Sequence, residues 1–144
     1  MSGEYDPLLL QNQLCFPLYA ASKALVRRYE PFLAPLGITY TQYLVLMVLW
    51  EKKEITVNDL GERVCLDSGT LSPLINKLVV KGLIEKRKLN DGRYRLLFLT
   101  EKGVALREKC LDIPGQIGSC LPLSPEEAQT MYALCYKLLQ GETK

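Results

Sequence analysis

The sequence predicts a mainly α fold with a small β component (α+β), and two adjacent stretches carry this prediction. Residues 65–78 read Cys-Leu-Asp-Ser-Gly-Thr-Leu-Ser-Pro-Leu-Ile-Asn-Lys-Leu, which is typical of a turn followed by a capped amphipathic helix. Two short strand-like segments follow, Leu83–Arg87 and Arg93–Leu99, joined through an Asn-Asp-Gly turn. With a further helix before residue 65, this order predicts a winged helix-turn-helix over about residues 40–100.

The predicted second helix has two faces of different chemistry. Its aliphatic residues recur at helical spacing and would hold the helix to the domain: Leu71, Leu74, Ile75 and Leu78. Its polar residues project elsewhere and are candidate contacts to DNA bases and phosphates: Ser68, Thr70, Ser72, Asn76 and Lys77. An ordinary amphipathic helix shows the same pattern, so the interpretation depends on the hairpin that follows.

The hairpin concentrates positive charge. From Lys77 to Arg95 the chain has seven basic and two acidic residues, whereas the remainder has eleven basic and fourteen acidic residues. The net charge of +2 therefore hides a basic module where DNA phosphates would lie. The candidate DNA contacts in the hairpin are Arg87, Arg93 and Arg95. A charged hairpin that is merely solvated is the alternative interpretation.

Helical patterns flank this module. The other predicted helices cover about residues 12–36, 40–50, 57–64, 101–112 and 125–139. Thr39, Thr56 and Ser124 precede three of them and are expected to cap them. The terminal helices have little core of their own to cover, which favours pairing with a second chain. We therefore expect one domain, residues 1–144, with dimerisation helices in N- and C-terminal arms at about 7–36 and 112–144.

Composition limits the class of function. The chain has 144 residues, 48% of them hydrophobic, which is enough for one core. It has no histidine, the commonest general base and metal ligand, which disfavours most hydrolytic and zinc chemistry. We expect no enzyme, no metal and no cofactor. No apolar run is long enough to span a membrane, and Glu4 and Asp6 do not suit a secretion signal. We expect a cytoplasmic protein without a membrane partner.

The five cysteines differ in what their surroundings predict. Free cysteines are common small core residues, which is the default interpretation for each. Cys15 departs from it, because Pro17 is best tolerated in a first turn, and a helix that begins near Cys15 would favour its thiolate. Cys120 lies in a Gly-Ser-Cys-Leu-Pro segment that we expect to be flexible, and Cys110 is its rival. Two cysteines are expected on packed helical faces, Cys65 and Cys135.

Motifs along nearly the whole chain resemble one family. They are Gln13-Leu14-Cys15-Phe16, Thr39-Tyr40 with Gln42-Tyr43-Leu44, Leu66-Asp67-Ser68-Gly69-Thr70-Leu71 with Pro73-Leu74, and Asp91 with Arg93. Through them the chain resembles the MarR-type regulators, and within these the organic hydroperoxide sensors called OhrR. The resemblance implies a homodimeric repressor of double-stranded DNA with an inverted-repeat operator. It also implies release of that operator when an organic hydroperoxide oxidises Cys15.

The resemblance also implies roles for tyrosines and for a second cysteine. Tyr19, Tyr29 and Tyr40 match positions that surround the sensing sulfur and hydrogen-bond to it, some from the partner subunit. Cys120 matches the resolving cysteine of the two-cysteine branch, where it closes a disulfide with the oxidised cysteine of the other subunit. Two other functions stay open at this point. One is a MarR-type repressor released by a small aromatic ligand, and the other is a thiol-dependent peroxidase.

Overall fold

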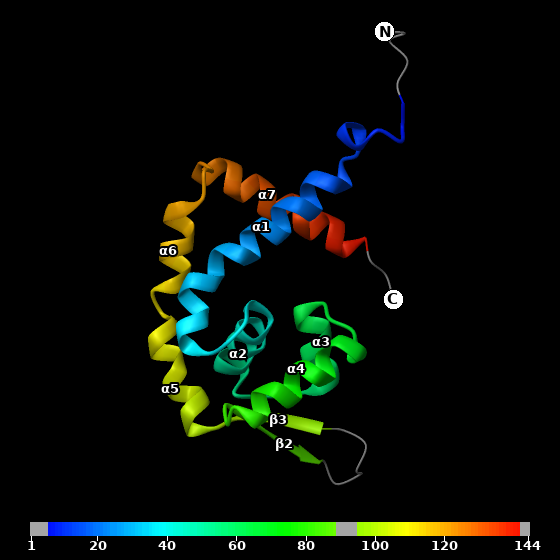
Figure 1. Ribbon diagram of the computed structural model, residues 1–144. Coiled ribbons are helices and arrows are strands. Elements are labelled where there is room, and N and C mark those ends of the chain that lie inside the picture. The colour runs from blue at the N-terminus through cyan, green and yellow to red at the C-terminus, as the bar shows by residue number, and fades with distance from the viewer. Residues whose placement is uncertain (1–5, 89–94, 142–144) are drawn as a thin grey trace. The chain divides into compact units, whose positions relative to one another are not determined.

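The computed structural model describes residues 6–88 and 95–141 (Figure 1). The predicted helices and strands occur in the predicted order, and elements at residues 10–12, 54–56 and 113–120 were not predicted. The helices and strands are the 3₁₀ helix η1 (Leu10–Asn12), α1 (Cys15–Leu33), the 3₁₀ helix η2 (Ala34–Leu36), α2 (Tyr40–Lys52), β1 (Glu54–Thr56), α3 (Val57–Val64), α4 (Ser68–Val80), β2 (Ile84–Lys88), β3 (Arg95–Leu99), α5 (Glu101–Cys110), α6 (Ile113–Cys120) and α7 (Pro125–Gln140). The predicted mainly helical class with a small sheet is confirmed. The predicted turn and Arg93 lie outside the described residues.

The chain divides into two compact units, residues 1–113 and 114–144. The first unit contains α1 to α5 and the sheet, and the second contains α7 and all but the first residue of α6. The division falls close to residue 112, where the C-terminal arm was expected to begin. The grouping of all 144 residues into one domain stays a prediction.

Side-chain caps determine where the helices begin. Thr39 Oγ1 accepts the Gln42 N–H at 3.3 Å and Gln42 Oε1 accepts the Thr39 N–H at 3.1 Å, which forms a capping box at the start of α2. Asp67 Oδ1 accepts the Thr70 N–H at 2.8 Å at the start of α4. Three more caps work in the same way at α3, α5 and α7: Thr56, Thr100 and Ser124. The predicted starts of these helices are confirmed.

The core of the first unit lies between the helices and the sheet. Helices α2, α3 and α4 contact one another, while β2 contacts α4 and β3 contacts α3 (Figure 1). The sheet is antiparallel in the order β1-β3-β2. The side chains that fill this core are aliphatic and almost fully buried: Leu46, Leu49, Leu60, Leu71, Leu78 and Leu97. Burial of this apolar area is the main source of stability that holds α4 in place.

Three local predictions were wrong. The helix expected over residues 12–36 is divided into η1, α1 and η2, and Gly37 at φ 75° ends the last of these. Cys65 is exposed, because it occupies the left-handed C-cap of α3 at φ 58° and not a packed face. Cys120 is the last residue of α6, a helix that the sequence did not predict, and not part of a connecting segment between two helices. Pro114 sits in the first turn of α6, where its missing N–H interrupts no helical hydrogen bond.

Within the part of the chain that the structure describes, no single helix is both long enough and apolar enough to cross a membrane. Among residues 6–88 and 95–141, one pair of segments, 15–36 and 40–52, meets that length and composition when taken together, and the chain bends by 74° between them.

Candidate nucleic-acid interface and sensing thiol

Helix α4 presents the polar face that the sequence predicts. Its apolar stripe is buried, with exposed fractions of 0–8%. All five predicted polar contacts are exposed: Ser68, Thr70, Ser72, Asn76 and Lys77. The Thr70 N–H that Asp67 accepts also holds the pKa of the Asp67 carboxyl below its usual value. The cap therefore stays ionised and orders the first turn of α4, where the candidate base contacts begin.

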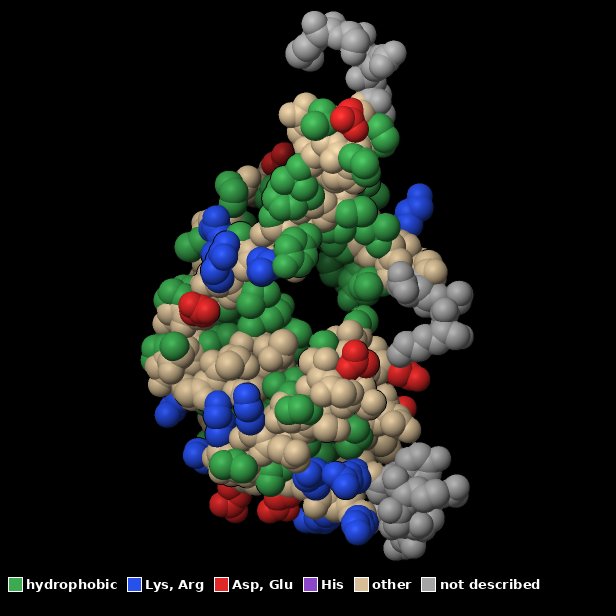
Figure 2. Space-filling view, turned by 45° about the vertical axis from the view of Figure 1, so that its right-hand side comes forward, with side chains coloured by type: hydrophobic (Ala, Val, Ile, Leu, Met, Phe, Trp, Pro, Cys, Tyr) green, Lys and Arg blue, Asp and Glu red, His purple; other side chains and the backbone are tan. Residues whose placement is uncertain are grey.

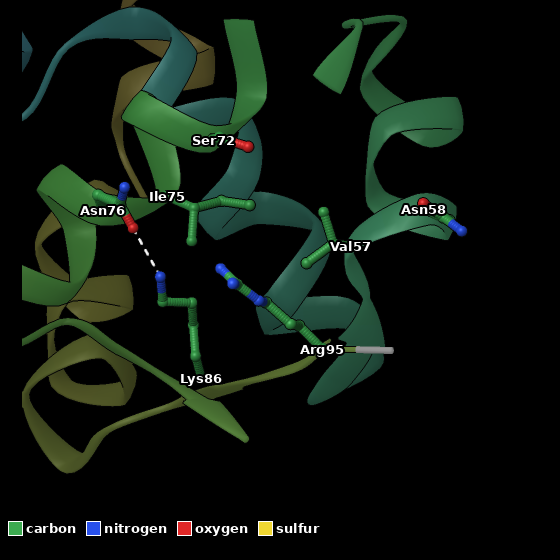
Figure 3. A pocket seen from close by; sticks show the side chains of 7 residues that line it. All are labelled: Val57, Asn58, Ser72, Ile75, Asn76, Lys86 and Arg95. Atoms are coloured by element: carbon green, nitrogen blue, oxygen red, sulfur yellow. Dashed lines mark hydrogen bonds between the residues drawn. The ribbon is translucent and has the colours of Figure 1, made fainter. Parts of the chain in front are cut away.

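A hollow of about 320 Å³ lies between α3, α4 and one face of the sheet (Figure 3). Its lining residues are Val57, Asn58, Ser72, Ile75, Asn76, Lys86 and Arg95. Lys86 Nζ donates to Asn76 Oδ1 at 2.6 Å, which ties β2 to α4. Arg95 extends from β3 into the same hollow (Figure 3). Two cations from the two strands therefore stand beside the polar face of α4.

Strand register decides which basic side chains share this face. In the antiparallel pair, Lys86 lies opposite the buried Leu97, and Lys88 lies opposite Arg95. Because residues alternate between the two faces of a strand, Lys86, Lys88 and Arg95 share the face toward α4, and Arg87 points to the other face. Figure 2 shows Lys and Arg side chains gathered at the lower end of the view, where Figure 1 places β2 and β3.

Arg87 makes contacts of its own on the opposite face. Its guanidinium lies 4.3 Å from the Phe98 ring centroid and 3.6 Å from Glu85 Oε2. The ion pair is exposed and contributes little to stability, whereas the stacking covers the outer side of the sheet. As a DNA contact, Arg87 stays a prediction. Sequence reasoning did not select Lys86 and Lys88, although their positions two and four residues after the inward Ile84 place them on the same face of the strand and could have identified them.

Two of the three predicted sensor tyrosines lie together. The Tyr29 and Tyr40 rings are 4.7 Å apart, and Tyr43, not predicted, lies 5.9 Å from Tyr29 and 6.3 Å from Tyr40. Burial raises the pKa of Tyr29 and Tyr40 and raises that of Tyr43 to about 12. All three hydroxyls are therefore protonated at neutral pH and can donate a hydrogen bond. The sequence placed Tyr43 only in a motif, because its contact with Tyr29 depends on the packing of α1 against α2.

The third tyrosine lies with Cys15 at the other end of α1. Cys15 is the first residue of the helix, as predicted, and residues 15–19 are all exposed. Tyr19 is one turn further on, and its hydroxyl accepts from Lys23 Nζ at 3.1 Å. Fourteen residues separate Cys15 from Tyr29, which is about 21 Å along an α-helix. Within one chain, therefore, α1 keeps Cys15 away from the Tyr29–Tyr40 pair.

The other cysteines have contrasting environments. Cys110 is buried, and burial raises the pKa of its thiol, so it is a poor nucleophile at neutral pH. Cys120 is exposed at the end of α6, and Cys135 on α7 is half-buried. Between the two candidates for a second reactive cysteine, accessibility favours Cys120.

The fold and the basic face define a winged helix-turn-helix DNA-binding protein. Residues 38–94 match the MarR family. The chain is 44% identical to the organic hydroperoxide resistance transcriptional regulator of Bacillus subtilis (strain 168) over 141 residues, which cover 97% of this chain and 96% of that relative. The chain therefore belongs to the MarR family of transcriptional regulators, with that regulator as a near relative, and it is not an enzyme.

Solved structures agree with this assignment. Reduced AbfR bound to DNA, a protein of Staphylococcus epidermidis, is similar with a TM-score of 0.77 and 34% identity over 92% of each chain. Disulfide-formed AbfR is similar with a TM-score of 0.68 and 36% identity, covering 91% of this chain and 90% of that one. The likeness to a DNA-bound structure supports DNA as the partner of this chain.

The two faces of the sheet predict unequal effects for two arginines. We expect Arg95→Ala to weaken operator binding and to reduce the slope of log affinity against log salt by about one, because one phosphate contact is lost. Arg87→Ala is the matched control and should change that slope by less than about half as much. Fluorescence anisotropy at several salt concentrations, with an operator duplex selected by the protein from a random pool, measures both. Equal slopes for the two variants would contradict the assignment of faces.

Proposed function

We propose that this protein is a homodimeric, cytoplasmic repressor that releases its operator when an organic hydroperoxide oxidises Cys15. The observation that carries the proposal is the place of Cys15 as the exposed first residue of α1. The first-turn N–H groups of a helix have no carbonyl partner within it, so they can donate to sulfur. The name of the B. subtilis relative, which refers to organic hydroperoxide resistance, supports this choice of oxidant.

The chemistry needs only the thiolate and the peroxide. The sulfur of Cys15 attacks the terminal peroxide oxygen, the O–O bond breaks, and the alcohol leaves with the proton of the hydroperoxide, which leaves a sulfenate that takes a proton from water. Sulfur becomes a sulfenic acid and the hydroperoxide is reduced to the alcohol. A second thiol then attacks the sulfenic sulfur, which forms a disulfide and releases water. The relative AbfR has been solved in a disulfide form, which supports such a step in this family.

A second chain is required to complete the sensor pocket. Cys15 and the Tyr29–Tyr40 pair stand about 21 Å apart along α1, a distance that a rigid helix cannot close. A partner whose α1 runs antiparallel to this one would bring its Tyr29 and Tyr40 to Cys15, and so assemble the pocket twice. Protonated tyrosine hydroxyls would there donate to the sulfenate oxygen.

Exposed apolar surface supports the same dimer. At the start of α1 the exposed large apolar residues include Phe16 and Leu18 of the helix and its N-cap residue Leu14, which is 84% exposed. On α7 they include Met131, Leu134 and Leu138, each at least half exposed. Apolar faces of this size on two separate helices are typical of an interface between chains. We assign both to the dimer, with Cys120 as the resolving cysteine and the buried Cys110 as a structural one.

The role of Cys15 predicts a repressor that binds but does not respond. Cys15→Ser should bind operator within about twofold of the parent, because a hydroxyl nearly fills the space of a thiol, yet hydroperoxide should not release it. The measurement is a gel shift with and without cumene hydroperoxide. Cys65→Ser, another exposed cysteine, is the control and should respond like the parent. Release of Cys15→Ser at the parent's hydroperoxide concentration would refute Cys15 as the sensor.

The resolving step predicts a covalent dimer. After hydroperoxide, the parent should run as a dimer on non-reducing electrophoresis. Cys15→Ser and Cys120→Ser should run as monomers, because an intersubunit disulfide needs one thiol from each chain, with Cα atoms within about 7 Å. Cys110→Ser should still form the dimer. A dimer that persists without Cys120 and disappears without Cys110 would transfer the resolving role to Cys110. A parent that never forms one would place the protein in the single-cysteine branch.

A further inference from the structure

Lys81 connects the C-terminal end of α4 to the corner between η2 and α2. It is the C-cap residue of α4, and its side chain is half-buried. Its Nζ donates to Gln42 Oε1 at 2.8 Å and to the carbonyl oxygen of Gly37. Lys102 Nζ donates to the Lys81 carbonyl at 2.9 Å, which also holds the backbone of this residue. The ammonium group is therefore held at a point where α4 meets the start of α2.

That corner carries the aromatic cluster. Tyr40 is the first residue of α2, and the capping box between Thr39 and Gln42 encloses it. Gln42 is only 2% exposed, and its Oε1 accepts from both the Thr39 N–H and Lys81 Nζ. A displacement of the first turn of α2 that moves Tyr40 also moves the acceptor of Lys81. The side chain of Gln42 thus links the turn that carries Tyr40 to Lys81 at the end of α4.

Stability alone does not account for an ammonium group at this place. The positive N-terminal end of α2 disfavours a nearby cation, which offsets the favourable effect of the negative C-terminal end of α4, where Lys81 lies. Ordering a lysine side chain also costs conformational entropy, and a methionine of similar length would carry no charge to desolvate. What the ammonium adds is directional bonding to two acceptors on a different helix. Such bonding specifies a position more than it adds free energy of folding.

We propose that Lys81 is a positioning residue that couples the operator-binding helix α4 to the Tyr29–Tyr40 corner. Operator binding orders α4, and Lys81 transfers that order to the first turn of α2. Coupling between two sites is reciprocal. The factor by which operator binding shifts the conformational equilibrium at the tyrosines therefore equals the factor by which a shift at the tyrosines changes the affinity of α4 for operator. The DNA half of this coupling rests on the family's DNA binding, and the oxidant half rests on the proposed function.

Hydrogen exchange tests the DNA half without any oxidant. In the full-length reduced dimer, operator should slow amide exchange in residues 39–44 by at least about fivefold, whereas in Lys81→Met the slowing should fall below about twofold. Lys81→Arg keeps a cation with several donors and should restore the parent's protection. Lys52→Met removes an exposed lysine from the other end of α2 and should behave like the parent.

Two results would overturn the proposal. One is equal protection of residues 39–44 in the parent and in Lys81→Met at saturating operator, and the other is no gain of protection in the parent. Lys81→Gln, which keeps a shorter neutral donor, replaces Lys81→Met if thermal melting shows that the latter does not fold. It should lose the protection as well, and protection equal to the parent's in it would also overturn the proposal.

A second arm separates this inference from the proposed function. With cumene hydroperoxide, the ratio of operator affinities before and after oxidation should be at least about threefold smaller in Lys81→Met than in the parent. A purely structural role for Lys81 would weaken both affinities equally and leave that ratio unchanged, which would refute the coupling. A parent that shows no change on oxidation would refute the proposed function, while the exchange measurement would still decide the role of Lys81.

Discussion

The rigidity of helix α1 is the constraint on which the rest of the account depends. A continuous helix from Cys15 to Leu33 holds Cys15 and Tyr19 at one end, and Tyr29 at the other, where it meets Tyr40 of α2. No side-chain rotation closes a gap of about 21 Å within one chain. If the tyrosines serve the thiol, they serve that of another subunit. The sensor pocket then forms only in a dimer, and the exposed apolar faces of α1 and α7 are explained as the interface of that dimer.

The DNA face depends on a second arrangement, in which buried leucines fix the orientation of α4. Since Leu71, Leu74 and Leu78 point into the core, the polar residues of the helix must point outward. Burial also fixes the orientation of β3, because Arg95 lies two residues before the buried Leu97 and therefore shares its face, toward α4. Lys86 then joins β2 to Asn76. The result is a polar and basic surface assembled from α4 and both strands, with Lys81 holding the far end of α4 against α2.

Local signals explain what could be predicted from the sequence. Caps such as Thr39 and Thr56 and the apolar stripe of α4 depend on neighbours within four residues, and the structure has them where they were expected. The three-residue strand β1 is too short for any periodicity, and the left-handed turn at Cys65 reverses its expected burial. The place of Tyr43 beside Tyr29 depends on packing between α1 and α2, which no local pattern encodes. The side of the sheet to which Arg87 points likewise depends on the pairing of β2 with β3, which no local pattern encodes.

The central claim is that oxidation of one thiol per subunit switches the protein from DNA-bound to free. The most direct test is a titration of the operator complex with cumene hydroperoxide, in which peroxide consumed and operator released are followed together. The account predicts release that is complete at about one equivalent of peroxide per subunit and is reversed by dithiothreitol. Operator that stays bound after several equivalents of peroxide have been consumed would contradict it.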